Sequence, residues 1–143
     1  MKTKAGRLAA AAIVCLAWAG PAMAAETSKV VYHVNEGVDK SRVVLRNVNN
    51  HITAEPGAKI MVVGHGAGID FLLDGAKDKN NTPFDASVDT LQAKGVEFRV
   101  CNNTLVSRKI DPKSVIPQAK IVPSGVAEIG RLQAKEGYVY LKP

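Results

Sequence analysis

Hydrophobic and polar positions along the chain follow two alternating patterns, one typical of strands and one typical of helices. Short apolar or alternating runs predict five strands, over residues 29–34, 59–63, 96–100, 119–123 and 138–141. Apolar positions at helical spacing predict helices between them, over about 39–54, 83–94, 104–110 and 125–136. This alternation predicts one α/β domain, a three-layer α/β/α arrangement around a five-stranded, mainly parallel sheet.

The first 24 residues follow neither pattern. Lys2, Lys4 and Arg7 precede an apolar run over residues 8–19, which is too short to span a bilayer comfortably, and Ala22-Met23-Ala24 has the A-x-A form of a cleavage site. This arrangement predicts a secretory signal peptide over residues 1–24 and a single domain over residues 25–143. We therefore expect a periplasmic protein with no stable membrane insertion after cleavage.

Removal of the leader changes the charge and the cysteine content. The full chain has 19 Lys and Arg against 13 Asp and Glu, and three of the positive residues leave with the leader, so the mature net charge is +3. No basic run is interleaved with aromatic residues, which argues against a nucleic-acid partner. Cys15 leaves too, so Cys101 is the only cysteine of the mature chain and has no internal disulfide partner.

Cys101 falls where the third predicted strand ends and the next helix begins. Asn102 and Asn103 are residue types that cap helices, and backbone N–H groups at a helix N-terminus favour a thiolate over a thiol. Arg99 lies two positions earlier on the strand, hence on the same face, and is expected to act in the same direction. A buried cysteine that only packs as a small apolar residue is the alternative.

A glycine-rich loop follows the second predicted strand. The carboxyl ends of parallel strands meet at one edge of a sheet, so Gly64-His65-Gly66-Ala67-Gly68 and Cys101 are expected to lie near one another. Backbone N–H groups of Gly66, Ala67 and Gly68 are candidates for holding an anion. His65 is a candidate for binding a ligand or taking a proton from Cys101, or else is simply exposed or bonded to backbone.

The remaining polar residues suggest no further chemistry. His33 and His51 are interpreted as structural, and Asp70, Asp74 and Asp78, spaced by four, as a solvated helix face. No His, Cys, Asp and Glu spacing resembles a metal site, and no phosphate-binding loop occurs, so the sequence implies no cofactor. Glu97 and Arg99 share one face of the third strand, which predicts that this strand is an edge of the sheet or meets a partner subunit.

The segments GHGAGIDFLL (residues 64–73) and VEFRVCNNTL (residues 96–105) resemble the DsrE/DsrF-like family. The resemblance covers the mature chain and implies a flavodoxin-like fold and a homo-oligomer. It also implies that Cys101 carries sulfur as a persulfide, received from or passed to a partner protein. The leader would make this chain an exported branch of the family.

Three functions fit these patterns. The first is sulfur or redox handling by Cys101 through a transient persulfide or mixed disulfide. The second is a non-catalytic module that binds a small ligand or anion, and the third is a structural oligomer in which Cys101 only packs. The sequence leaves open whether the protein is an enzyme.

Overall fold

A computed structural model describes residues 27–143, so the predicted signal peptide over residues 1–24 lies outside the described residues. The strands are β1 (Lys29–Val34), β2 (Lys59–Gly64), β3 (Glu97–Cys101), β4 (Ala119–Val122) and β5 (Val139–Leu141). The helices are α1 (Val38–Ala54), α2 (Asp85–Ala93), α3 (Asn102–Ser107) and α4 (Gly125–Glu136), with two 3-10 helices, η1 (Gly66–Leu72) and η2 (Pro112–Ser114).

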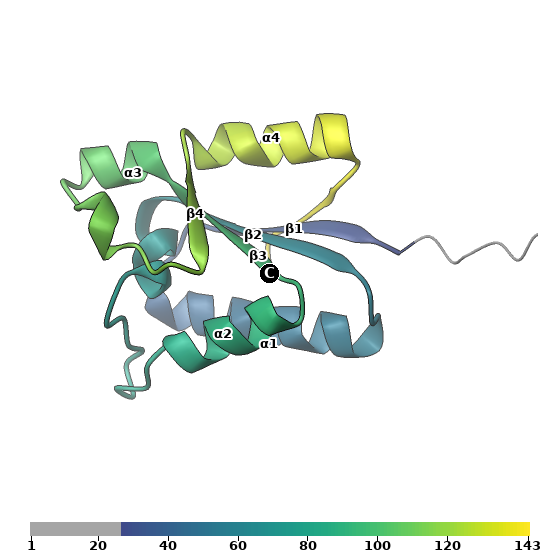
Figure 1. Ribbon diagram of the computed structural model, residues 1–143, viewed down its shortest axis with the longest axis horizontal. Helices are drawn as coiled ribbons and strands as arrows, with labels where there is room; N and C mark the ends of the chain where they lie inside the picture. The colour runs from purple at the N-terminus through teal and green to yellow at the C-terminus, as the bar shows by residue number, and fades with distance from the viewer. Residues whose placement is uncertain (1–26) are drawn as a thin grey trace, which may run out of the picture.

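The five strands form one parallel sheet in the order β4-β3-β2-β1-β5. The chain moves stepwise from β1 to β4, and α4 then carries it back across the sheet to the free side of β1 (Figure 1). Helices α1 and α2 lie against one face and α4 against the other (Figure 1). The predicted α/β class, with five parallel strands in a three-layer arrangement, is confirmed.

The face beneath α1 and α2 carries most of the apolar core. Alternate strand residues, among them Val62 and Phe98, point into this face, and all of their side chains are buried. Phe71 from η1 and Phe84 from just before α2 meet them, with ring centroids 5.8 Å apart. Apolar residues at helical spacing on α1 and α2 pack against these side chains and cover this face of the sheet.

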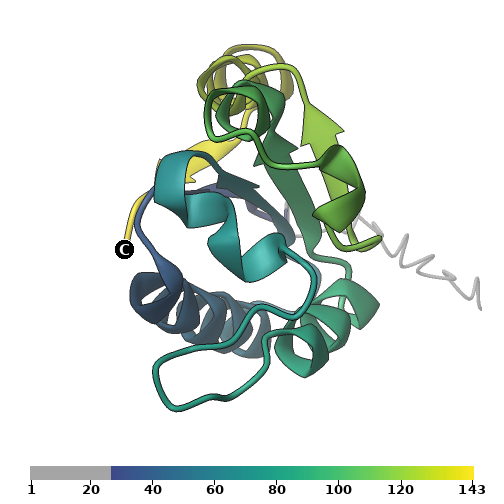
Figure 2. The same cartoon turned by 90° about the vertical axis from the view of Figure 1, so that its left-hand side faces the viewer.

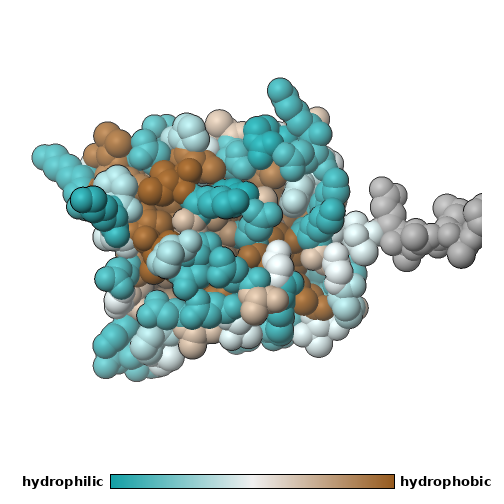
Figure 3. All heavy atoms as spheres, viewed as in Figure 1, coloured by the Kyte–Doolittle hydropathy of each residue, from teal (hydrophilic) through white to brown (hydrophobic). Residues whose placement is uncertain are grey.

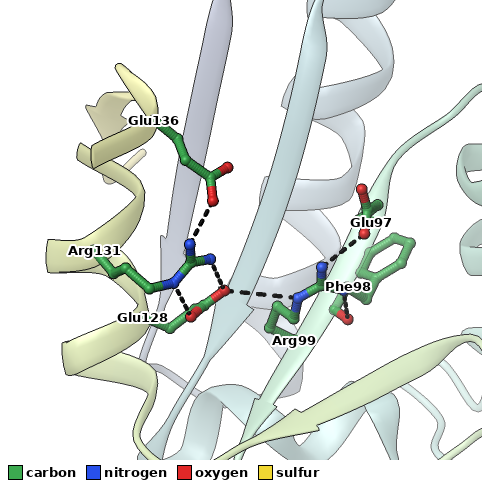
Figure 4. A network of polar contacts seen from close by, with 6 residues as sticks. All are labelled: Glu97, Phe98, Arg99, Glu128, Arg131 and Glu136. Atoms are coloured by element: carbon green, nitrogen blue, oxygen red, sulfur yellow. Dashed lines mark hydrogen bonds and ion pairs between the residues drawn. The ribbon is translucent and has the colours of Figure 1, made fainter. Parts of the chain in front are cut away.

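The face beneath α4 has a much smaller apolar core. Its buried residues are Val31, Met61, Val63, Ile129 and Leu132. Charged groups fill the space over β3 (Figure 4).

Arg99 donates to Glu97 at 2.7 Å and lies 3.8 Å from a carboxylate oxygen of Glu128. Arg131 donates to Glu128 and also contacts Glu136. The second face is therefore polar on the β3 side of the sheet.

Three local expectations are wrong. β3 is not an edge strand, because it lies between β2 and β4, and its polar face is covered by Glu128 of α4. Helix α3 begins at Asn102 and not near Thr104, because Cys101 is itself the extended N-cap residue.

Asp70, Asp74 and Asp78 also share no helix face, since η1 ends at Leu72 and neither Asp74 nor Asp78 lies in a helix. Asp70 pairs with Arg108 and Asp78 with Arg42.

The C-terminal part of the chain matches its sequence signals. Ser124 caps α4 by accepting a hydrogen bond from the Ala127 N–H, and Gly137 ends the helix in the left-handed conformation. Within residues 27–143, none of the helices combines the length and the apolar character needed to cross a bilayer.

Candidate functional site

The candidate site lies at the carboxyl edge of the sheet, which faces the viewer in Figure 2. There the end of β2 continues into η1, and β3 runs directly into α3. Gly125, the first residue of α4, reaches the same place from the other side of the sheet. The structure therefore brings together the two segments that the sequence singled out, and adds the start of α4.

Backbone segments approach one another so closely here that side chains are excluded. A Cβ on Gly64 would lie 2.5 Å from the Gly68 carbonyl oxygen, and one on Gly68 would lie 2.1 Å from the carbonyl oxygen of Val34. A Cβ on Gly125 would meet the Cβ atoms of Cys101 and His65 at 3.2 and 3.3 Å. The glycines allow this close packing, which places both Cys101 and His65 against Gly125.

Cys101 is a buried free thiol whose sulfur is surrounded by hydrogen-bond donors. Burial, the largest single influence, raises its pKa. The opposing hydrogen bonds come from the Gly125 N–H, the Thr104 hydroxyl, and the N–H groups of Thr104 and Asn103, and together they place the pKa of Cys101 below its ordinary value. The donors thus make the thiolate of this enclosed cysteine easier to form than that of an ordinary cysteine.

Thr104 connects the cysteine to the glycine loop. Its hydroxyl oxygen accepts a hydrogen bond from the Gly66 N–H at 2.9 Å. Because a threonine hydroxyl has one proton, that proton remains available for the sulfur of Cys101. The predicted proximity of the loop and the cysteine is therefore realised through a specific polar contact.

His65, the second residue of the loop and the N-cap of η1, contacts another histidine. Its Nε2 lies 2.6 Å from Nε2 of His33, and the two rings stack with centroids 4.7 Å apart. His33 in turn places Nδ1 2.6 Å from the hydroxyl oxygen of Tyr140 on β5. His33, which the sequence pattern presents as structural, therefore links the candidate site to the C-terminal strand through these two contacts.

Arg99 shares a sheet face with Cys101, as alternation along β3 requires, but its guanidinium is directed elsewhere. It pairs with Glu97 and Glu128, and it is absent from the groups that shift the pKa of Cys101 (Figure 4). Two carboxylates neutralise its charge locally. The thiolate is therefore stabilised by short-range donors, and the expected action of Arg99 on it is not seen.

The remaining predicted residues occupy the site in other ways. Asn102 and Asn103 form the first turn of α3, and the Asn103 N–H is shared between Cys101 and the Pro123 carbonyl. The N–H of Gly66 is taken by Thr104, and the N–H of Gly68 by the His65 carbonyl. The loop consequently lacks the two free N–H groups that the anion-binding hypothesis requires of those glycines.

A surface groove of about 650 Å³ lies away from this site, between α1, α2 and the loop over residues 78–80. Arg42 lines it but is already held by Asp78, Ser87 and two backbone carbonyls. None of the predicted site residues lines the groove. Within residues 27–143 no cluster of three or more His, Cys, Asp or Glu is arranged to hold a metal ion.

Sequence reasoning missed Thr104, Gly125, His33 and Tyr140. Thr104 is three residues after Cys101, one helical turn away, which is a local signal that was available. Gly125 and Tyr140 are distant in sequence and reach the site only through the crossing of α4 and the pairing of β5 with β1. No local pattern contains that information.

Comparison with known proteins gives the site its context. Residues 23–143 match the model of the DsrE/DsrF-like family. The chain belongs to this family. No curated protein matches it.

Two solved structures of similar shape are informative about the fold. The protein of unknown function MTH1491 from Methanobacterium thermoautotrophicum has 28% sequence identity and a TM-score of 0.70, over 81% of this chain and 99% of that one. The ychN protein from E. coli has 15% identity and a TM-score of 0.68, over 82% of this chain and all of that one. Both support a DsrE/DsrF-like fold, and neither name states an activity.

Proposed function

We propose that this DsrE/DsrF-like protein carries sulfur on Cys101 as a persulfide. The observation that carries the proposal is the set of donors around the buried sulfur, which lowers the pKa of a thiol that burial alone would raise. A thiolate is the form that attacks sulfur, and a water-poor site protects the product from side reactions.

The reaction is a displacement at sulfur. The Cys101 thiolate attacks the outer sulfur of a persulfide donor R–S–SH, the donor S–S bond breaks, and its electron pair leaves with R–S⁻. The new S–S bond gives Cys101 a persulfide, and no external oxidant is needed. Attack by an acceptor thiolate on the outer sulfur then returns Cys101 to its thiolate.

Sulfur loading tests this proposal directly. The protein is incubated with cysteine persulfide and digested. The mass of the peptide that contains Cys101 is then measured by mass spectrometry, so that any adduct on Cys15 is detected separately. We expect one added sulfur on Cys101, none at that position in Cys101→Ser, and slower loading in Thr104→Val. Thr90→Val, on the exposed side of α2, is the matched control. Absence of the adduct from folded wild-type protein would contradict the proposal.

We also propose that the protein is exported to the periplasm. The support is the cationic start, short apolar run and A-x-A site within residues 1–24. N-terminal sequencing of material from the periplasm is expected to begin at Ala25. Recovery of that material with Met1 intact would contradict cleavage.

We further propose a homo-oligomer. Val106, Ile121 and Val126 are exposed apolar residues of α3, β4 and the start of α4, and Figure 3 shows apolar atoms gathered over this region. An exposed apolar patch of this kind favours association.

Light scattering at micromolar concentration is expected to give a multiple of the monomer mass, reduced by Val126→Lys but not by Val43→Lys on α1. A monomeric wild-type protein would contradict the assembly. The sulfur donor or acceptor protein is a separate partner, and it would have to approach the carboxyl edge of the sheet to reach Cys101.

A further inference from the structure

Three side chains beside the cysteine form a continuous hydrogen-bonded chain that sulfur loading alone does not explain. Tyr140 of β5 contacts Nδ1 of His33, and Nε2 of His33 contacts Nε2 of His65, with both distances 2.6 Å. The chain starts at a tyrosine that is 39% exposed and ends at a histidine beside the buried Cys101. It therefore connects solvent with the interior of the site.

Both histidines favour the neutral form. Burial lowers the pKa of His33, with further lowering by His65 and Lys142, and burial followed by Lys142 lowers the pKa of His65. A neutral imidazole has one N–H and one free nitrogen. Lys142 is the cation that lowers the pKa of both rings, Tyr140 is the phenol that contacts His33, and Cys101 lies with His65 against Gly125.

Only two proton arrangements satisfy both hydrogen bonds with neutral rings. In the first, His65 donates from Nε2 to His33, and His33 donates from Nδ1 to the Tyr140 oxygen. In the second, Tyr140 donates to His33, and His33 donates from Nε2 to His65. The first arrangement leaves Nδ1 of His65 without a proton, and the second leaves it protonated.

We propose that the Tyr140–His33–His65 chain conducts the proton of Cys101 to solvent. The idea rests on the proposed sulfur chemistry, because Cys101 attacks the donor as a thiolate, so a protonated thiol must lose its proton before it can be loaded. It assigns His33 and Tyr140 as positioning residues that act through His65.

Each transfer breaks one bond to hydrogen and forms another. The thiol proton passes to Nδ1 of His65, directly or through one water, and the Nε2 proton of His65 moves to Nε2 of His33. The Nδ1 proton of His33 moves to the Tyr140 oxygen, whose own proton goes to water. The net result is one thiolate and one proton in solvent, with the chain converted from the first arrangement to the second.

Position supports the connection between the chain and the thiol. The Cβ atoms of Cys101 and His65 both lie within 3.3 Å of the position that a Cβ on Gly125 would take, so the two atoms are separated by no more than the sum of these two distances. Cys101, His33 and Tyr140 also lie on the same sheet face, the one covered by α4. The cysteine itself is only 5% exposed, so its proton needs a route out.

Nitrogen NMR of the imidazole rings tests the inference on the full chain. Titration of Cys101, followed by thiolate absorbance as the difference from Cys101→Ser, is compared with the ¹⁵N shifts of His33. We expect Nδ1 and Nε2 of His33 to exchange protonated and unprotonated shifts with the same midpoint as the thiol. A residue that merely packs would not change tautomer when a distant thiol ionises.

Two variants complete the test. Tyr140→Phe is expected to abolish the coupled change at His33 while Cys101 still ionises. Tyr32→Phe, which removes the hydroxyl that contacts Nδ1 of His51 at 2.9 Å, is the matched control and is expected to leave the coupling intact. If Cys101 ionises and loads sulfur while His33 keeps one tautomer, the proton route is wrong and the carrier function stands. If Cys101 neither ionises below unfolding nor loads sulfur, both proposals are overturned.

Discussion

The two faces of the sheet are filled in opposite ways. The face under α1 and α2 is closed by fully buried phenylalanines, Phe71, Phe84 and Phe98, within a continuous apolar cluster. Within residues 27–143, the apolar cluster under α4 has five buried members, and the Arg99–Glu128 pair lies beside it. Cys101, His33 and Tyr140 all lie on this second face.

The difference explains why the candidate site lies on the α4 face of the sheet. A thiolate or a hydrogen-bonded imidazole would lose hydration without compensation in the phenylalanine layer. On the α4 side, backbone N–H groups and hydroxyls replace that hydration, and close packing at the glycines fixes them in place. The first face carries most of the apolar core, and the second carries Cys101 and the histidines of the candidate site.

Truncating each apolar core should give the largest and most unequal effects. Phe98→Ala is expected to lower the free energy of unfolding by about 3–5 kcal/mol, because a fully buried ring leaves a large cavity. Ile129→Ala, in the smaller core, is expected to cost about 2 kcal/mol, near the lower limit for such changes. Urea unfolding measures the free energy of unfolding of both variants. An equal loss in the two would contradict the claim that the face under α1 and α2 carries most of the stabilising core.

Adding one methyl at the start of α4 should disturb the second face alone. Gly125→Ala places a carbon 3.2 Å from the Cys101 Cβ, and overpacking is expected to cost about 1–3 kcal/mol and raise the pKa of the thiol. Gly130→Ala on the same helix meets nothing within 4 Å and is expected to stabilise the protein by up to about 1 kcal/mol. Urea unfolding gives the stability and thiolate absorbance the pKa. Similar results for both variants would refute the close-packing argument.

The second face should also make stability depend on pH. His33 and His65 have lowered pKa values in the folded state, so the unfolded chain binds more protons between those values and the ordinary value of about 6.5. Their contribution is complete above about pH 6.5 and is lost as the pH falls through the folded pKa values.

Unfolding free energies measured between neutral and acid pH are expected to fall less steeply in a double variant, His33→Gln with His65→Gln. The single variant His51→Gln controls for a histidine outside the site. An unchanged slope in the His33 and His65 variant would show that these residues do not cause the acid sensitivity.

Removing the charge of Arg99 should have the smallest effect. The side chains of Arg99 and Glu128 are 13% and 12% exposed, but Arg99→Gln leaves Glu128 paired with Arg131, so the expected loss of stability is about 1 kcal/mol. The pKa of Cys101 is expected to stay where it is, because Arg99 does not act on it. A clear rise in the pKa of Cys101 in this variant would restore the long-range role that the sequence suggested for Arg99.

Local sequence patterns were sufficient for the elements and for part of the site. The alternation at Phe98 and Val100, and the capping signals at Ser124 and Gly137, predicted the strands and helices correctly. They also placed Cys101 and His65 at one edge, because parallel strands bring their carboxyl ends together. They failed for η1, whose glycines were interpreted as a loop.

Contacts between distant segments lay beyond such patterns. Whether β3 is central, where Arg99 points, and which side chain reaches His65 all depend on α4 crossing the sheet and β5 pairing with β1. Tyr140 is 107 residues from His33 along the chain, so no periodicity relates them. Tertiary topology determined these features, and the sequence alone had no short-range signal for it.

The pKa of Cys101 in the folded protein is the measurement that tests the account most directly. Thiolate absorbance, taken as the difference between wild type and Cys101→Ser, requires no reagent to enter the buried site and cancels the signal of Cys15. We expect a midpoint below the value of about 8.5 for a free cysteine, moved upward by Thr104→Val and restored by Thr104→Ser. A midpoint above that value, or a thiol that ionises only when the protein unfolds, would mean that burial outweighs the hydrogen-bond donors. Cys101 would then be only a buried packing residue.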